Sequence, residues 1–339
     1  MRKVAQSMVA NARSRNAPAS GDALDATRAL LRRFRSQRPL RGGSLLLTIF
    51  GDAIAPRGGV ATLGSLIRLA APFGLTERLV RTSMARLAQD GWLGARRDGR
   101  LSEYGLTPSG AQRFAEATHR IYSQGPASWD GNWTMLIASA TSGERRERLR
   151  EELRWRGFGE ITAGVYAHPA CSIEQARQWL QEIQGARAGV LLRSSTGELT
   201  ADRELVAAGW DLQELTRRYR RFLDAFRAVE SAIASPAAGA AALDPESSFI
   251  VRTLLIHEYR KIHLQDPLLP PALLPEGWVG AAAYDLCRGL YARVFDGAEE
   301  YLSSTASTLD HPLPPADAAA YERFGGIRRA NQLQAERSQ

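Results

Sequence analysis

Arginine residues separated by small or polar residues recur along one predicted helix, which has Thr76 as its N-cap and continues to about Asp90. Helical spacing places Val80, Met84 and Leu87 on one apolar face. The opposite face lacks the Glu and Lys pairs typical of a solvated helix. That face carries Arg78, Arg81, Thr82, Ala85, Arg86 and Gln89. Guanidinium groups bind phosphates and guanine edges, and small residues allow close approach, so this face is suited to the major groove of DNA.

A basic hairpin is predicted directly after this helix. Short extended runs flank Asp98-Gly99, and an Asp-Gly pair in this setting is a strong signal for a two-residue turn. Arg96, Arg97 and Arg100 lie around the turn. A hairpin of this kind can contact the DNA backbone or enter the minor groove.

The elements around this helix and hairpin complete a recognisable order. Helices are expected over Ser44–Gly51 and Thr62–Ala71, and another begins at Thr107-Pro108. Three helices and then a hairpin form a winged helix-turn-helix, so we predict such a domain over residues 42–122, with a double-stranded DNA operator as its partner. The predicted DNA-binding residues are Thr76, Arg78, Arg81, Thr82, Ala85, Arg86, Gln89, Arg96, Arg97 and Arg100. The alternative is a protein-binding adaptor, which would lack salt-sensitive affinity for DNA.

Charge is distributed unevenly along the 339 residues, whose formal net charge is +8. Residues 1–41 contain ten basic and two acidic residues, and residues 42–122 contain ten basic and six acidic residues. The remainder is acidic overall, so we expect a polyanionic partner for the N-terminal part alone. Residues 1–41 are polar and predict a disordered basic tail, which is either solvated or an arm that adds phosphate contacts.

A second domain is predicted over residues 123–200. Its pattern is strand, helix, strand, strand, helix, strand, over residues 133–139, 143–156, 158–161, 164–167, 172–184 and 188–193. This is the order of a ferredoxin-like α/β sandwich. An exposed face or edge of its sheet could pair with a second copy, so this domain is the expected site of dimerisation.

A helical domain is predicted over residues 201–305. Apolar residues at spacings of three and four from Leu212 to Val229 indicate one long amphipathic helix, and helices are expected over residues 246–263 and 279–304, with a linker at 236–242. Residues 306–339 are predicted to form a mobile tail. Together these segments indicate a multi-domain α+β protein: winged helix-turn-helix, ferredoxin-like sandwich and helical C-terminal domain.

Two segments could carry metal chemistry, but each lacks a required ligand. The run from His257 to Lys261 begins like the zinc motif H-E-x-x-H, yet Lys261 occupies the second histidine position, and His263 lies over halfway round the helix. The central domain resembles the small CRISPR-associated ferredoxin-like nucleases, which have a metal-binding aspartate after the first strand. Here that strand ends in Ile137-Ala138-Ser139-Ala140. A metal-dependent nuclease is therefore the disfavoured alternative, and we expect no enzyme activity, metal or cofactor.

The sequence also bears on location. No run approaches 18 consecutive apolar residues, and the first 25 residues lack the apolar core of a signal peptide. The two cysteines, Cys171 and Cys287, are far apart, and no CxxC pair occurs. We expect a cytoplasmic protein with reduced thiols and no membrane association.

Several segments resemble the PaaX-type repressors of phenylacetate-degradation operons. They lie in the predicted recognition region, in the central domain and in a proline-containing run near the C-terminus. The segments are Arg78–Thr82, Arg86-Leu87, Asp90–Leu93, Arg156–Gly159, Gly164–Tyr166 and Asp266-Pro267 … Leu269-Pro270 … Leu274-Pro275 … Trp278–Gly280. The last run is the most distinctive, and the resemblance covers roughly residues 42–305.

The resemblance implies a ligand-responsive transcriptional repressor. It implies a homodimer on a palindromic operator, control of an aromatic-acid catabolic operon, and release by an acyl- or aryl-CoA effector such as phenylacetyl-CoA. A CoA thioester needs cations for its phosphates and an apolar slot for its acyl group. The candidate effector-binding residues are Tyr259, Arg260, Lys261, His263 and Trp278. The operator sequence and the identity of the effector stay open.

Overall fold

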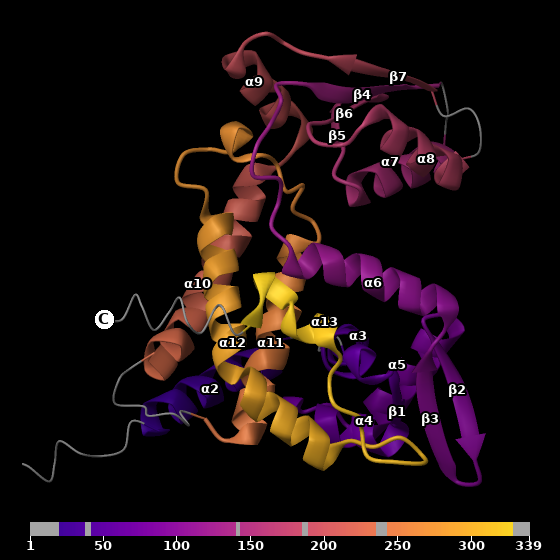
Figure 1. Ribbon diagram of the computed structural model, residues 1–339, viewed down its shortest axis with the longest axis vertical. Helices are drawn as coiled ribbons and strands as arrows, with labels where there is room; N and C mark the ends of the chain where they lie inside the picture. Colours follow the sequence, from indigo (N-terminus) through magenta and orange to yellow (C-terminus); the bar gives the residue numbers. More distant parts are fainter. Residues whose placement is uncertain (1–19, 38–41, 140–142, 185–188, 235–242, 328–339) are drawn as a thin grey trace, which may run out of the picture. The chain divides into compact units, whose positions relative to one another are not determined.

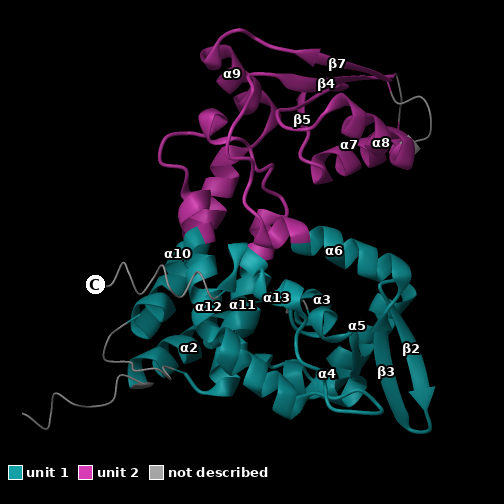
Figure 2. Ribbon diagram, viewed as in Figure 1, with its two compact units in different colours: residues 1–118, 222–258, 285–339 teal, residues 119–221, 259–284 magenta. Residues whose placement is uncertain are grey.

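Helices and two antiparallel sheets make up the computed structural model, as expected for a multi-domain α+β protein (Figure 1). It describes residues 20–37, 42–139, 143–184, 189–234 and 243–327. The chain divides into two compact units (Figure 2). Unit 1 comprises residues 1–118, 222–258 and 285–339, and unit 2 comprises residues 119–221 and 259–284.

The first part of unit 1 combines three helices with a three-stranded sheet. The helices are α3 (Gly42–Ile49), α4 (Leu63–Ala70) and α5 (Glu77–Gln89). The strands are β1 (Val60–Thr62), β2 (Leu93–Asp98) and β3 (Leu101–Leu106), in the order β1-β3-β2. Gly99 adopts a φ of +54° in the turn between β2 and β3, a conformation that glycine tolerates best. The predicted helices and hairpin are confirmed, whereas β1 was not anticipated.

The predicted disordered tail over residues 1–41 is wrong for part of its length. Helix α2 (Ser20–Arg35) carries Ala23, Leu30 and Phe34 into the core of unit 1. The Phe34 ring packs edge-on against Phe73, with 6.1 Å between ring centroids. Apolar residues spaced along one helical face bury enough surface to order this segment despite its polar composition. Residues 1–19 and 38–41 lie outside the described residues, so the proposed phosphate-contacting arm is not tested there.

The predicted mobile tail over residues 306–339 is also wrong where the structure describes it. Residues 306–327 include helix α13 (Ala318–Tyr321) and bury Leu313, Phe324 and Ile327 in unit 1. The backbone carbonyl of Ser307 accepts a hydrogen bond from the Thr62 amide at 3.0 Å. This segment therefore packs against the helices and strands near the N-terminus, although it is far from them in sequence.

Five further helices follow along the described part of the chain, apart from those of the central sheet. The predicted amphipathic helix begins at Leu212, and α9 ahead of it was not anticipated. Their bounds are α6 (Pro108–Tyr122), α9 (Leu199–Gly209), α10 (Leu212–Ala234), α11 (Pro245–His263) and α12 (Val279–Thr305). The linker predicted at residues 236–242 lies outside the described residues. None of the helices in the described part of the chain is long and apolar enough to cross a membrane.

Unit 2 contains a four-stranded antiparallel sheet in the order β5-β6-β4-β7. The strands are β4 (Trp133–Ala138), β5 (Gly159–Thr162), β6 (Val165–His168) and β7 (Gly189–Ser194), and the helices between them are α7 (Glu144–Trp155) and α8 (Ile173–Gln184). Leu136 of β4 and Tyr166 of β6 pack with α7 and α8 in one core. On the other face, Ile137 and Val190 are paired in register and are 48% and 62% exposed.

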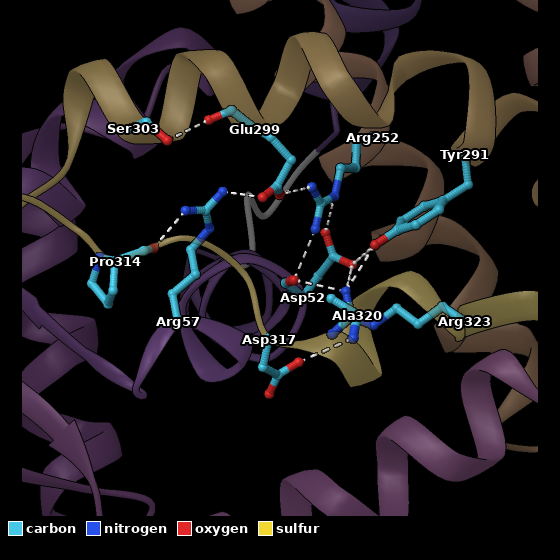
Figure 3. Close-up of polar contacts among 10 residues, drawn as sticks. All are labelled: Asp52, Arg57, Arg252, Tyr291, Glu299, Ser303, Pro314, Asp317, Ala320 and Arg323. Atoms are coloured by element: carbon cyan, nitrogen blue, oxygen red, sulfur yellow. Dashed lines mark hydrogen bonds and ion pairs between the residues drawn. The ribbon is translucent and has the colours of Figure 1, made fainter. Parts of the chain in front are cut away.

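A buried ionic network joins distant parts of unit 1 (Figure 3). Asp52, just after α3, accepts a hydrogen bond from the Arg252 guanidinium at 2.7 Å and another from Arg323 at 3.0 Å. Tyr291 also donates to Asp52, at 2.9 Å, and Arg252 reaches Glu299 at 2.6 Å. Burial alone would lower the pKa of Arg252, but these neighbours hold that pKa well above its ordinary value. The network therefore links the α3 region to α11, α12 and the C-terminal segment by paired charges.

Candidate nucleic-acid interface

Helix α5 is delimited by local signals at both ends. The Thr76 side-chain oxygen accepts a hydrogen bond from the Leu79 amide at 3.3 Å, so this residue is the N-cap. Gly91, with a φ of +74°, follows the last turn, in the left-handed conformation common after helices. Val80 and Met84 are fully buried, which fixes the rotation of the helix about its axis. The face opposite them must therefore point to solvent.

The six residues predicted on that face of α5 are all exposed, as is Thr76. Arg81 donates from Nε to Glu77 at 2.8 Å, one turn earlier on the same helix. The Thr82 hydroxyl donates to the Arg78 carbonyl at 2.9 Å and keeps acceptor capacity for another partner. The exposed ion pair between Arg81 and Glu77 contributes little to stability. Arg81 can therefore leave Glu77 and bind a phosphate at small cost in free energy. The face can thus bind a polyanion without rearrangement of the helix.

The hairpin between β2 and β3 also exposes its three arginines, Arg96, Arg97 and Arg100. Arg96 differs from the other two because it contacts two carboxylates, Glu103 at 3.1 Å and Asp310 at 3.0 Å. The hydrogen bond to Asp310 and the charge of Glu103 hold the pKa of Arg96 above its ordinary value. The positive charge of Arg96 is therefore already paired with carboxylates of the same chain.

Asp310 is a residue that sequence reasoning missed. The segment that carries it is held against the hairpin, since the Leu309 amide donates to Glu103 at 2.8 Å. Nothing in the local sequence around Asp310 indicates a contact with the hairpin, because the stretch was expected to be mobile. Its partner Arg96 lies more than 200 residues earlier. Only the folded chain brings the two together.

The predicted effector residues do not form one cluster. His263 and Trp278 line a cavity of about 360 Å³ within unit 2. Tyr259 is fully buried and stacks on the His263 ring, with 4.7 Å between centroids, but it does not line the cavity. Arg260 and Lys261 are half-buried and do not line it either. The cavity is also lined by Tyr219, Asp266 and Tyr284, which the sequence did not single out as effector-binding residues.

The histidines considered for metal binding have other partners. His257 Nδ1 lies 3.0 Å from the Thr48 hydroxyl in unit 1, and His263 Nδ1 lies 3.1 Å from the Tyr219 hydroxyl in unit 2. Within the described ranges, no group of three or more His, Cys, Asp or Glu residues could hold a metal ion.

Models of one protein family match three consecutive parts of the chain. The PaaX-like protein model matches residues 41–110, the PaaX protein central Cas2-like domain matches residues 126–206, and the PaaX-like protein C-terminal domain matches residues 210–304. The Transcriptional repressor PaaX of Escherichia coli (strain K12) is 33% identical over 293 residues, which cover 85% of this chain and 92% of that protein. Among solved structures, the uncharacterized protein Rv0674 from Mycobacterium tuberculosis is 27% identical, with a TM-score of 0.44, over 70% of this chain and 91% of that chain.

The fold and the exposed basic face define a multi-domain α+β protein with a candidate nucleic-acid interface. The chain belongs to the PaaX family, because family models cover its three successive parts and the similarity to the Escherichia coli protein extends over most of both chains. The family resemblance inferred from the sequence is confirmed.

Proposed function

We propose that this protein is a ligand-responsive transcriptional repressor and has no enzyme activity. The observation that carries the proposal is the exposed face of α5, with Arg78, Arg81 and Arg86 around Thr82, Ala85 and Gln89. Three helices and the sheet order β1-β3-β2 support a winged helix-turn-helix, in which α5 enters the major groove and the hairpin is the wing. The name of the Escherichia coli relative, a transcriptional repressor, supports the same function.

The proposed target is a palindromic operator of an aromatic-acid catabolic operon, of the phenylacetate type, and the proposed effector is an aryl-CoA thioester. Both rest on membership of the PaaX family. A dimer is needed to read a palindrome, because the two-fold symmetry of the protein matches that of the site.

We place the dimer contact on the sheet of unit 2. The strand order β5-β6-β4-β7 supports a ferredoxin-like sandwich, whose helices α7 and α8 pack on one face. The other face exposes Ile137 and Val190 side by side, and β7 is an edge strand. Exposed apolar residues next to an unpaired edge are the features that a second copy would cover.

Substitution in α5 tests the DNA-binding proposal. Arg78→Ala and Arg81→Ala should each weaken binding to a duplex selected from a random-sequence library, by about 1–3 kcal/mol if a base contact is lost. Arg227→Ala is the matched control, because Arg227 is 64% exposed and pairs within its own helix, with Asp224. Gel-shift titration measures the affinities.

If both α5 variants bind the duplex with wild-type affinity, Arg78 and Arg81 do not contact DNA and the proposed role of this face is refuted. The same protein incubated with duplex DNA and Mg²⁺ or Mn²⁺ should leave the duplex intact. Metal-dependent cleavage would instead favour a nuclease built on the central sheet.

A further inference from the structure

Helix α2 carries three arginines in a line on its exposed side. The residues that fix its rotation against the core of unit 1 are Ala23, Thr27, Leu30 and Phe34, all buried. Arg28, Arg32 and Arg35 follow at spacings of four and three residues, so they share a different face of the helix, and all three are exposed. These three residues, the α2 arginine row, extend over about 10 Å of the helix axis.

The end of this row lies against the turn that precedes α5, inside unit 1. The Arg35 guanidinium donates a hydrogen bond to the backbone carbonyl of Pro72. A Cβ atom on Gly74 would lie 3.6 Å from Cγ of Arg35, so the arginine stem runs over this glycine in van der Waals contact. Gly74 is two residues before Thr76, the N-cap of α5. The row therefore begins beside the N-terminal end of the helix proposed to enter the major groove.

The charges of the row are largely available to a partner. Arg28 pairs with Asp25 at 3.3 Å, but both side chains are exposed, so the pair is weak. Among the residues that the structure describes, no carboxylate forms an ion pair with Arg32. The negative end of the helix dipole favours basic residues in the last turn of α2, yet it does not determine which way their side chains point.

The position and chemistry of the row fit the phosphate backbone of DNA. The N-terminal residues of a recognition helix contact base edges, so the turn before that helix lies near the strands that border the groove. Guanidinium groups bind phosphates through paired hydrogen bonds. A membrane surface fits less well, because the apolar face of α2 is already buried in unit 1 and cannot insert into lipid.

We propose that the α2 arginine row binds backbone phosphates beside the major groove that α5 enters, and that it adds affinity without adding sequence preference. The inference rests on the DNA-binding function proposed above and extends the interface from α5 and the hairpin to α2. Arg32 is the principal phosphate ligand, because its charge is exposed and has no paired carboxylate in the described part of the chain. Arg35 joins the row to the turn before α5.

Two neighbouring substitutions test this assignment. Arg32→Gln should reduce the slope of log affinity against log salt by about one, on the selected duplex and on an unrelated duplex alike, because one phosphate contact is lost. Arg33→Gln is the matched control. Arg33 is exposed and lies in the same last turn, but at least about 100° round the helix from each member of the row. Fluorescence anisotropy gives both slopes, and equal changes in the two variants would overturn the assignment.

Ethylation interference on the selected duplex locates the contact. At least one phosphate should weaken binding of the wild type when it is ethylated and have no such effect on Arg32→Gln, because that variant no longer uses it. The ratio of affinities for the selected and unrelated duplexes should be the same in Arg32→Gln and the wild type. Identical interference patterns for the two proteins, or a changed ratio, would refute a role confined to the backbone.

The α5 variants separate this proposal from the proposed function. If Arg78→Ala and Arg81→Ala weaken binding while Arg32→Gln behaves like Arg33→Gln, the α2 assignment is refuted and the role of α5 stands. If only Arg32→Gln weakens binding, the row contacts DNA and the role of α5 is refuted. Vesicles that contain phosphatidylglycerol provide a further arm. Binding to them that depends on Arg32, with unchanged DNA affinity, would assign the row to a lipid surface and overturn the proposal.

Discussion

At the scale of single residues, the three arginines of the hairpin are not equivalent. Arg96 is bound by Glu103 and Asp310, whereas Arg97 and Arg100 extend from the exposed end of the hairpin. A phosphate that binds Arg96 must compete with two carboxylates already in place. Arg97 and Arg100 are therefore expected to carry most of the hairpin's electrostatic attraction to DNA.

Salt dependence measures this difference. Arg97→Gln should weaken binding to any duplex and reduce the slope of log affinity against log salt by about one, because one phosphate contact is lost. Arg96→Gln should change the slope less, because its charge is already paired. Fluorescence anisotropy at a series of salt concentrations gives both slopes. A larger change for Arg96→Gln than for Arg97→Gln would contradict the assignment.

At the scale of secondary-structure elements, the ion network around Asp52 connects helices that are far apart in sequence. Arg252 is 1% exposed and Asp52 is 4% exposed, so neither charge has access to bulk water. Removal of the Asp52 charge takes a carboxylate partner from both Arg252 and Arg323, and Arg252 keeps only Glu299 of its two carboxylate contacts described above. Loss of charge pairing in a buried site is costly even where the intact network adds little net stability. The network therefore restricts how α11 and the C-terminal segment can move relative to the α3 region inside unit 1.

Asp52→Asn should lower the free energy of unfolding by about 3–5 kcal/mol, because Arg252 and Arg323 lose their buried carboxylate partner. Asp285→Asn provides the control, since the Asp285 carboxylate pairs with Arg288 at 3.0 Å but its side chain is 56% exposed. That control should cost about 0–1 kcal/mol. Urea unfolding followed by circular dichroism compares the two variants. Similar losses in both would mean that the buried network contributes no more than a surface pair.

The central sheet should confer a defined sensitivity to acid through His168. Burial lowers the pKa of His168 to about 4, and its Nδ1 accepts hydrogen bonds from the amides of Ala170 and Cys171, both at 2.9 Å. The unfolded chain, with an ordinary histidine pKa near 6.5, takes up this proton first as the pH falls. Stability is therefore complete above about pH 6.5 and is lost as the pH falls towards 4, by at most about 3 kcal/mol.

His168→Asn removes the titrating group and keeps an acceptor for the two amides. The difference in unfolding free energy between the wild type and this variant should shrink between about pH 6.5 and pH 4. Denaturant titrations at a series of pH values measure it. A difference that stays constant over this range would show that His168 is not the titrating group.

At the scale of the whole molecule, the proposed dimer depends on the exposed apolar pair on the unit 2 sheet. Val190→Glu places a charge beside Ile137 and should convert a dimer into a monomer, because burial of an unpaired carboxylate is strongly unfavourable. Leu199→Glu is the control: Leu199 is also exposed, at 45%, but lies on α9. Sedimentation velocity distinguishes the two states. If Val190→Glu remains a dimer, the dimer interface does not lie on this face of the sheet.

Sequence reasoning was most successful where the determinants are local. The limits of α5 follow from Thr76 and Gly91, and its buried face follows from the spacing of Val80, Met84 and Leu87. The exposure of every predicted DNA-facing side chain follows from the same periodicity. The short strand β1 and helix α9 were not predicted. Strand β1 has three residues, too few to show an alternating pattern, and the N-cap residue of α9 makes no side-chain hydrogen bond to the helix.

The sequence by itself determined the family, through the segments that resemble PaaX-type repressors. It also determined the order of most helices and strands and which face of α5 meets solvent, because capping and periodicity act over a few residues. Only the tertiary structure decided that Asp310 pairs with Arg96, that residues 20–35 and 306–327 are ordered, and that Tyr219 and Asp266 line one cavity with Trp278. These features arise from contacts between segments tens to hundreds of residues apart. The apolar face of residues 20–35 is a local pattern, but the contacts that bury it, like the others, form only when several elements pack at once.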